Sequence, residues 1–194
     1  MVNKIIVESL EKSAELKKQI LNDSELLERI DSAASLMIAA FNRGGKVLFC
    51  GNGGSAADAQ HLAAELSGRF NYDRAPLYAE ALHVNGSYLT AVANDYSFDV
   101  VYQRMVQAAG RKGDVLVAIS TSGNSENILH AMVAAKHAGM SVIGFTGKTG
   151  GKMAYLCDEL INVPSVETPH IQEAHIAIGH ILCNIVESSI FPNP

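Results

Sequence analysis

Cys50-Gly-Asn-Gly-Gly-Ser55 is the stretch of sequence that decides the fold. It completes a short apolar run, residues 46–50, and leads into a helical pattern that carries His61 and Glu65. An apolar run, a glycine-rich turn and a helix in this order are typical of α/β proteins, in which helices connect parallel strands. The glycines allow positive φ angles and close approach of a ligand to the backbone, and we expect Ser55 to cap the helix. A tight turn that binds no ligand explains the glycines equally well.

Short apolar runs alternate with helical stretches along the rest of the chain. The further runs are residues 77–82, 114–119, 141–146 and 159–163. Together with residues 46–50 they predict a parallel sheet with helices on both faces, which is an α/β fold arranged as a three-layer α-β-α sandwich.

Two helices are expected before the first strand. Apolar residues recur at near-helical spacing over residues 4–21 and 24–43, and Gly44-Gly45 follows as a stop signal. We expect one domain over residues 1–194. Within it, residues 1–44 would form a helical extension that serves oligomerisation, and residues 45–194 would form the α/β core.

Composition argues against several classes of protein. The chain has 194 residues, of which 48% are hydrophobic, and a net charge of −5 without a run of Lys or Arg, so we expect no nucleic-acid partner. No apolar stretch approaches the roughly 20 residues of a membrane span, and the N-terminus lacks a secretory pattern, so we expect a cytoplasmic protein with no membrane partner. Three widely spaced cysteines support neither a disulfide framework nor a cysteine zinc site.

A second loop, Ile119-Ser-Thr-Ser-Gly-Asn-Ser125, also follows an apolar run and precedes a helix. Four of its residues carry hydroxyl groups: Ser120, Thr121, Ser122 and Ser125. Hydroxyls and backbone amides at a helix N-terminus bind phosphate without a lysine, whereas capping the helix needs only one hydroxyl. The sequence therefore favours a phosphate site over a simple cap.

Two nucleotide-binding motifs are incomplete in this chain. A dinucleotide fingerprint that begins at Gly51 would need glycine at position 56, which is alanine. Gly144-Phe-Thr-Gly-Lys-Thr149 resembles the end of a P-loop, but that motif would need glycine at position 142, which is valine. We therefore expect a phosphosugar rather than a nucleoside triphosphate.

Histidine, carboxylate and amide side chains recur at helical spacing in two segments. His61 and Glu65 are four residues apart, and Gln172 and His180 are eight apart, so each pair lies close to one face of its helix. Together they offer two nitrogen and two oxygen donors, enough for a tetrahedral divalent metal site. Taken alone, His61 and Glu65 would be explained as a surface pair.

Three further polar residues are open to two interpretations. Arg69 is either a cation at the end of a helix or a substrate contact. Asn94 and Asp95 either cap a helix or recognise sugar hydroxyls.

A series of segments resembles the sugar isomerase (SIS) domain family, and within it the members that isomerise sedoheptulose 7-phosphate. The segments are Cys50-Gly-Asn-Gly-Gly-Ser55, Ala63-Ala-Glu-Leu-Ser-Gly-Arg69, Ala93-Asn-Asp95, Gly113-Asp-Val-Leu116, Ile119-Ser-Thr-Ser-Gly-Asn-Ser125, Thr146-Gly-Lys148 and Ile171-Gln-Glu173. The resemblance implies a flavodoxin-like, doubly wound fold with a five-stranded parallel sheet. It also implies a homotetramer whose active sites form at subunit interfaces.

The resemblance also implies a set of site residues. One zinc ion per subunit would be held by His61, Glu65, Gln172 and His180. Substrate contacts would come from Asn52, Gly53, Gly54, Ser55, Glu65, Arg69, Asn94, Asp95, Ser120, Thr121, Ser122, Ser125 and Gln172. The chain departs from the family where members often carry an acid and an arginine before Ile-Gln-Glu, because it has Pro169 and His170 there.

The activity implied by the resemblance is the isomerisation of D-sedoheptulose 7-phosphate to D-glycero-D-manno-heptose 7-phosphate through an enediolate. This is the first step of ADP- or GDP-heptose synthesis for lipopolysaccharide or capsule. We expect Glu65 and His180 to divide the acid and base roles. Two alternatives are a non-enzymatic tetramer that binds the replication initiator protein, to which the tail Ile190-Phe-Pro-Asn-Pro194 has some likeness, and a phosphosugar-sensing module.

Overall fold

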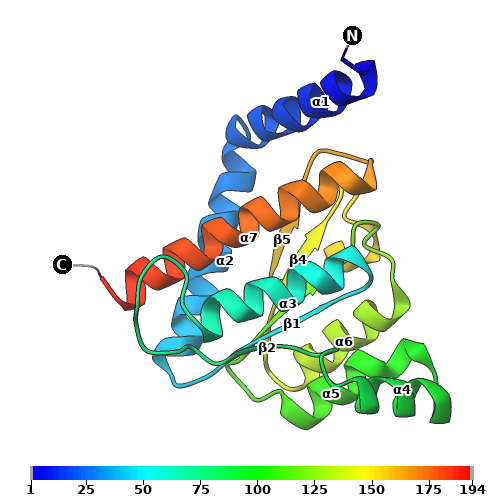
Figure 1. Cartoon of the computed structure of the whole chain (residues 1–194). Coiled ribbons are helices and arrows are strands. Elements are labelled where there is room, and N and C mark those ends of the chain that lie inside the picture. The colour runs from blue at the N-terminus through cyan, green and yellow to red at the C-terminus, as the bar shows by residue number, and fades with distance from the viewer. Residues whose placement is uncertain (1, 193–194) are drawn as a thin grey trace.

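Five parallel strands form the centre of the structure, a computed structural model that describes residues 2–192 (Figure 1). The strands are β1 (Val47–Gly51), β2 (Ala79–Ala81), β3 (Val115–Ile119), β4 (Ser141–Thr146) and β5 (Glu159–Asn162). Their order in the sheet is β2-β1-β3-β4-β5, and every neighbouring pair is parallel. The five apolar runs are thus confirmed as the strands of a doubly wound sheet with the flavodoxin-like order.

Helices cover both faces of this sheet. One face carries α2 (Ser24–Asn42), α3 (Gly54–Ser67) and α7 (Thr168–Ile190). The other carries α4 (Gly86–Asp95), α5 (Val101–Ala109) and α6 (Glu126–His137), with the short 3-10 helices η1 (Phe98–Val100) and η2 (Gly151–Tyr155) in the connections. Side chains alternate between the two cores along β1, so Phe49 enters the first and Leu48 the second. The predicted three-layer sandwich is confirmed.

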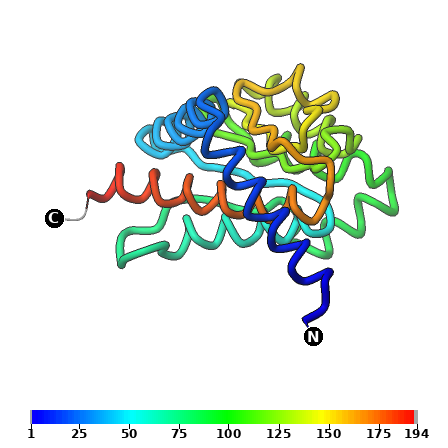
Figure 2. Tube along the Cα trace, turned by 90° about the horizontal axis from the view of Figure 1, so that it is seen from above, coloured from blue at the N-terminus to red at the C-terminus, as the bar shows by residue number. Residues whose placement is uncertain are grey.

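The first helix, α1 (Lys4–Leu21), projects from the body of the molecule (Figure 1) and crosses the beginning of α7 (Figure 2). Leu16 and Ile20 at its C-terminal end are buried, whereas Ile5 and Leu10 are 68% and 67% exposed. The two helices expected before the first strand are therefore present, and the role of this extension in oligomerisation stays a prediction. Across residues 2–192, none of the helices combines the length and the apolar character that crossing a membrane requires.

The carboxyl ends of β1 and β3 meet where the winding of the chain reverses. Gly51 at the end of β1 pairs with Ile119 at the end of β3. From these neighbouring strands the sheet continues in opposite directions, to β2 on one side and to β4 on the other. In open α/β sheets the connections diverge at such a point and leave a crevice for a ligand. The topology therefore brings the glycine-rich loop and the hydroxyl-rich loop to one place.

Candidate active site

A pocket of about 320 Å³ opens at the carboxyl ends of β1 and β3. Its lining contains nine of the predicted substrate contacts: Asn52, Gly53, Gly54 and Ser55 from the first loop, Ser120, Thr121, Ser122 and Ser125 from the second, and Gln172 from α7. Ile119 and Thr168, which the sequence analysis did not single out, complete the lining. Three segments that are far apart in the sequence thus share one pocket.

The glycine-rich loop begins α3 without help from a side chain. Gly53 precedes the helix with a φ of +56°, and no atom lies within 4 Å of the place where its Cβ would be. The prediction that Ser55 caps α3 is wrong, because the helix already begins at Gly54 and Ser55 lies buried in its first turn. The N-terminus of α3 consequently lies beside the pocket without a side-chain cap, as an anion-binding helix end requires.

The hydroxyl groups of the second loop lie close to one another. Ser120 Oγ lies 2.9 Å from Ser125 Oγ and 3.4 Å from Ser122 Oγ. Ser125 directly precedes α6, yet its side chain makes no capping hydrogen bond to that helix. The hydroxyls therefore do not serve as a simple helix cap, which was the alternative interpretation of this loop.

Asn52 and Asn127 tie the two loops together. Each side-chain amide donates to the other's oxygen, and both donor–acceptor distances are 2.9 Å. Asn127, in the first turn of α6, is 3% exposed. Asn127 was not predicted from the sequence, because nothing in the local pattern indicates which residue a loop amide will pair with across the sheet. The reciprocal pair holds the glycine-rich loop against the N-terminus of α6.

His61, Glu65 and His180 form a compact cluster further along α3 and α7, the helices that contribute Gly54 and Gln172 to the pocket. His61 Nε2 lies 3.0 Å from Glu65 Oε1 and 3.5 Å from His180 Nε2. One ligand atom from each of the three residues lies within 4.8 Å of the other two. Donor atoms bound at about 2.1 Å around a tetrahedral zinc ion stand roughly 3.4 Å apart, so the observed spacing suits a metal ion of that size. Gln172, the fourth predicted ligand, lies two turns before His180 on α7 and lines the pocket.

Asp58 also belongs to the surroundings of this cluster and was not predicted. It lies three residues before His61 on α3, and its Oδ2 is buried without a hydrogen-bond partner among the described residues. Burial raises the pKa of its carboxyl group, while the nearby His61 and His180 imidazoles offset part of that shift. The spacing of Asp58, His61 and Glu65 along one face of a helix is the signal that would have found it.

Four predicted substrate contacts are not part of the pocket lining. One of them, Glu65, belongs to the cluster described above. Arg69 follows the end of α3 and is exposed. Asn94 and Asp95 form the exposed end of α4, where Asn94 Nδ2 donates to Asp95 Oδ1 over 2.9 Å. Their contact with a substrate stays a prediction.

The two residues that depart from the family pattern have local structural roles in α7. Pro169 occupies the first turn of the helix, where proline is tolerated because the backbone N–H has no helical partner. His170 Nδ1 lies 3.5 Å from Glu173 Oε2, and His170 Nε2 lies 4.0 Å from Glu167 Oε2. His170 thus lies between two acids at the start of its own helix.

His175 joins α7 to the sheet beneath the site. The side chain is 1% exposed, and its Nε2 donates to the carbonyl oxygen of Thr146 at the end of β4 over 3.0 Å. Burial lowers the pKa of His175 to about 4, and the Thr146 carbonyl offsets only part of that shift. The imidazole is therefore neutral near pH 7, and its role is to hold the helix that carries Gln172 and His180.

Comparison with known proteins identifies the fold family. The sequence model of the SIS domain matches residues 8–147. The chain belongs to the SIS domain family. It is 61% identical to a phosphoheptose isomerase of Rhodospirillum rubrum over 83% of this chain and 86% of the relative. It is 52% identical to a phosphoheptose isomerase of Clostridium acetobutylicum over 94% and 93%.

A solved structure agrees with the SIS assignment. Phosphoheptose isomerase GmhA from Neisseria gonorrhoeae superposes with a TM-score of 0.90 at 45% identity, over 95% of this chain and 98% of that one. These similarities show that this SIS-domain chain is an enzyme, an isomerase of sugar phosphates. They decide against the initiator-binding and sensing alternatives. Asn193 and Pro194, part of the tail that suggested the former, lie outside the described residues.

Proposed function

We propose that this isomerase converts D-sedoheptulose 7-phosphate into D-glycero-D-manno-heptose 7-phosphate, the first step of ADP- or GDP-heptose synthesis for lipopolysaccharide or capsule. The observation that carries the proposal is that the same two helices serve both the pocket and the cluster. α3 begins in the pocket at Gly54 and carries Glu65, while α7 supplies Gln172 to the pocket and His180 to the cluster.

In this proposal the phosphate binds the hydroxyl-rich loop and the sugar extends toward the cluster. The hydroxyls of Ser120, Thr121, Ser122 and Ser125 line one wall of the pocket and can donate to phosphate oxygens. The glycine-rich loop and Gln172 form the opposite part of the lining, where the sugar hydroxyls would bind. Arg69, Asn94 and Asp95 are proposed as further substrate contacts.

We further propose that a zinc ion, one per subunit, is held by His61, Glu65, Gln172 and His180. The separations of 3.0 and 3.5 Å from His61 Nε2 to its neighbours support this, since they match those between ligands of one small ion. When bound, a divalent ion polarises substrate oxygens and stabilises negative charge that develops on them.

Glu65 and His180 are proposed as the acid and base that move the proton between C1 and C2. Glu65 Oε1 and His180 Nε2 both face His61, so each side chain keeps a second atom, Oε2 or Nδ1, that can exchange a proton with the substrate. The ring of Phe70 packs against the His180 imidazole with a centroid distance of 5.7 Å, which restricts the orientation of that imidazole.

We also propose that the chain acts as a homotetramer with active sites at subunit interfaces. The exposed apolar side chains of α1, including Ile5 at 68% and Leu10 at 67%, support an association of chains through this helix. A contribution of Asn94 and Asp95 from a neighbouring subunit would explain why they are not part of the pocket lining of their own chain.

The test is turnover of sedoheptulose 7-phosphate by the purified protein, before and after chelation and after addition of zinc. We expect formation of the aldose heptose phosphate that chelation abolishes and zinc restores. Turnover that survives complete chelation would contradict the metal site but not the reaction. A folded, zinc-loaded protein that isomerises other sugar phosphates and not this one would contradict the proposed substrate.

A further inference from the structure

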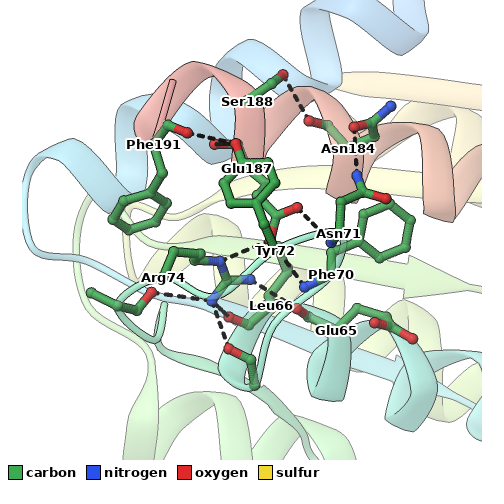
Figure 3. A network of polar contacts seen from close by, with 12 residues as sticks. Glu65, Leu66, Phe70, Asn71, Tyr72, Arg74, Asn184, Glu187, Ser188 and Phe191 are labelled. Carbon is green, nitrogen blue, oxygen red and sulfur yellow. Dashed lines mark hydrogen bonds and ion pairs between the residues drawn. The ribbon is translucent and has the colours of Figure 1, made fainter. Parts of the chain in front are cut away.

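Arg74 and Glu187 form an ion pair that is buried between the end of α3 and α7 (Figure 3). Arg74 Nε lies 3.1 Å from Glu187 Oε1, and the side chains are 2% and 0% exposed. Burying two charges carries a desolvation penalty, and the attraction between the two charges does not always exceed it. The partners of the two groups therefore indicate what the pair does.

Arg74 binds the C-terminal end of α3. Its Nη2 donates to the carbonyl oxygen of Glu65 over 2.9 Å, and its Nη1 donates to those of Leu66 and Gly68 over 2.8 Å each. The last carbonyls of a helix lack partners within the helix, and a cation at this end is favoured by the helix dipole. One of the three carbonyls belongs to Glu65, so Arg74 holds the backbone that carries the Glu65 carboxylate.

Glu187 binds the segment that follows α3. Its Oε1 accepts from the N–H of Phe70 over 2.9 Å, and its Oε2 accepts from that of Asn71 over 2.7 Å. Burial raises the pKa of Glu187, but these two N–H groups and Arg74 outweigh it and hold the pKa below its ordinary value. The charged carboxylate thereby anchors Phe70, whose ring packs against His180.

Packing at a glycine sets the separation of the two helices near the cluster. A Cβ on Gly179 would stand 2.5 Å from Leu62 Cδ1, so α3 and α7 approach closely one residue before His180. Apolar contacts of this kind allow one helix to slide along the other. Hydrogen bonds from a planar guanidinium group do not, because they need a fixed direction. The Arg74–Glu187 pair is the buried ionic part of a directional connection between the end of α3 and α7, to which Asn71 adds a hydrogen bond to Asn184 and Tyr72 adds hydrogen bonds to two carbonyl groups near the end of α7.

We propose that Arg74 and Glu187 are positioning residues that set Glu65 on α3 and His180 on α7 at their working separation. The inference rests on the proposed function, since it assigns the pair a role in the cluster that binds the metal and moves the proton. Arg74 acts on Glu65 through its carbonyl oxygen, and Glu187 acts on His180 through Phe70. Lysine cannot replace the arginine, because a single ammonium group cannot reach these carbonyls and Glu187 together.

The chain offers a matched control in Asp114, a second buried acid that is 2% exposed. Like Glu187 it accepts from two backbone N–H groups, those of Lys46 and Arg111 at 3.0 and 2.8 Å, and from one cation, Lys46 Nζ at 2.6 Å. It precedes β3 and so lies at the end of that strand opposite to the hydroxyl-rich loop. Glu187→Gln and Asp114→Asn therefore make the same chemical change, a carboxylate to an amide, at two buried sites with similar partners.

The experiment compares Glu187→Gln, Arg74→Lys and Asp114→Asn with the parent protein in three measurements: thermal unfolding, zinc affinity of the metal-free protein by competition with a chromophoric chelator, and kcat and KM. We expect Glu187→Gln and Arg74→Lys to weaken zinc binding by about 10- to 100-fold and to lower kcat more than they raise KM. Asp114→Asn should lose thermal stability to a similar extent while its zinc affinity and kcat stay at the parent level.

The inference is overturned if Glu187→Gln and Arg74→Lys lose stability but keep parental zinc affinity and kcat, as the control does. Arg74→Lys retains the charge, so it provides the test if Glu187→Gln does not fold. A parent protein that neither binds zinc nor isomerises the sugar phosphate would contradict the proposed function itself, a result that the parent alone reveals.

Discussion

Gly54 lies directly against the side-chain amide of Gln172. A Cβ on Gly54 would stand 2.5 Å from Gln172 Nε2 and 2.9 Å from Gln172 Oε1. Gly54 is not among the glycines with positive φ, so packing rather than backbone conformation requires glycine there. The contact connects the first residue of α3 to the second turn of α7, and it determines where the amide of Gln172 enters the pocket.

Gly54→Ala should lower activity by displacing Gln172. The methyl group cannot be accommodated without moving the amide, so we expect kcat/KM to fall by about 10-fold or more while the protein stays folded. Gly86→Ala is the control, because Gly86 also begins a helix without positive φ and no atom lies within 4 Å of its added Cβ. Equal kinetics of the two variants would show that the position of Gln172 is unimportant for turnover.

Ser122→Ala and Ser125→Ala should weaken substrate binding through the phosphate. A hydrogen bond to a charged group contributes about 1.5–3 kcal/mol, so each variant should raise KM by roughly 10-fold or more with a smaller change in kcat. Steady-state kinetics measures this, with Ser188→Ala as the control, since the Ser188 hydroxyl donates to the carbonyls of Asn184 and Ile185 in its own helix, α7. An unchanged KM in both pocket variants would show that the phosphate does not bind this loop.

Glu65→Gln and His180→Gln should lose turnover without losing the fold. Loss of an acid or base typically lowers kcat by about 10²- to 10⁴-fold, and both variants should also bind zinc more weakly. Single-turnover rates and zinc titration of the metal-free proteins test the two effects separately. His137→Gln, at the end of α6, is the control. Near-native turnover by either cluster variant would show that its residue is neither acid nor base.

Stability should depend on pH through His175. Its pKa falls from the ordinary 6.5 to about 4 in the folded protein because of burial. Below pH 6.5 the unfolded chain binds a proton that the folded one does not, so the free energy of unfolding should decrease by roughly 3 kcal/mol as the pH falls toward 4. Denaturant unfolding of the parent and of His175→Gln between pH 7 and 4 measures this. A parallel pH dependence of the two proteins would refute the assignment.

Most of the site could be predicted because it depends on local patterns. Apolar runs indicated the strands, and the glycine-rich and hydroxyl-rich loops follow two of them. Since carboxyl ends of parallel strands lie at one edge of the sheet, both loops were expected at that edge, and the adjacency of β1 and β3 brings them together. The spacing of His61 and Glu65 likewise follows from the period of one helix. The cap expected at Ser55 failed because Gly53 can adopt a positive φ and begin the helix earlier.

The sequence by itself determined the α/β alternation, the two loops and the donors on each helix, because each is a property of a few consecutive residues. Only the tertiary structure decided that Asn127 pairs with Asn52, 75 residues away, and that Arg74 pairs with Glu187, 113 residues away. Such contacts depend on the register of one element against another, and many partners have the right chemistry. Packing selects among them, since a buried charge or amide is stable only where its partner lies within hydrogen-bond distance.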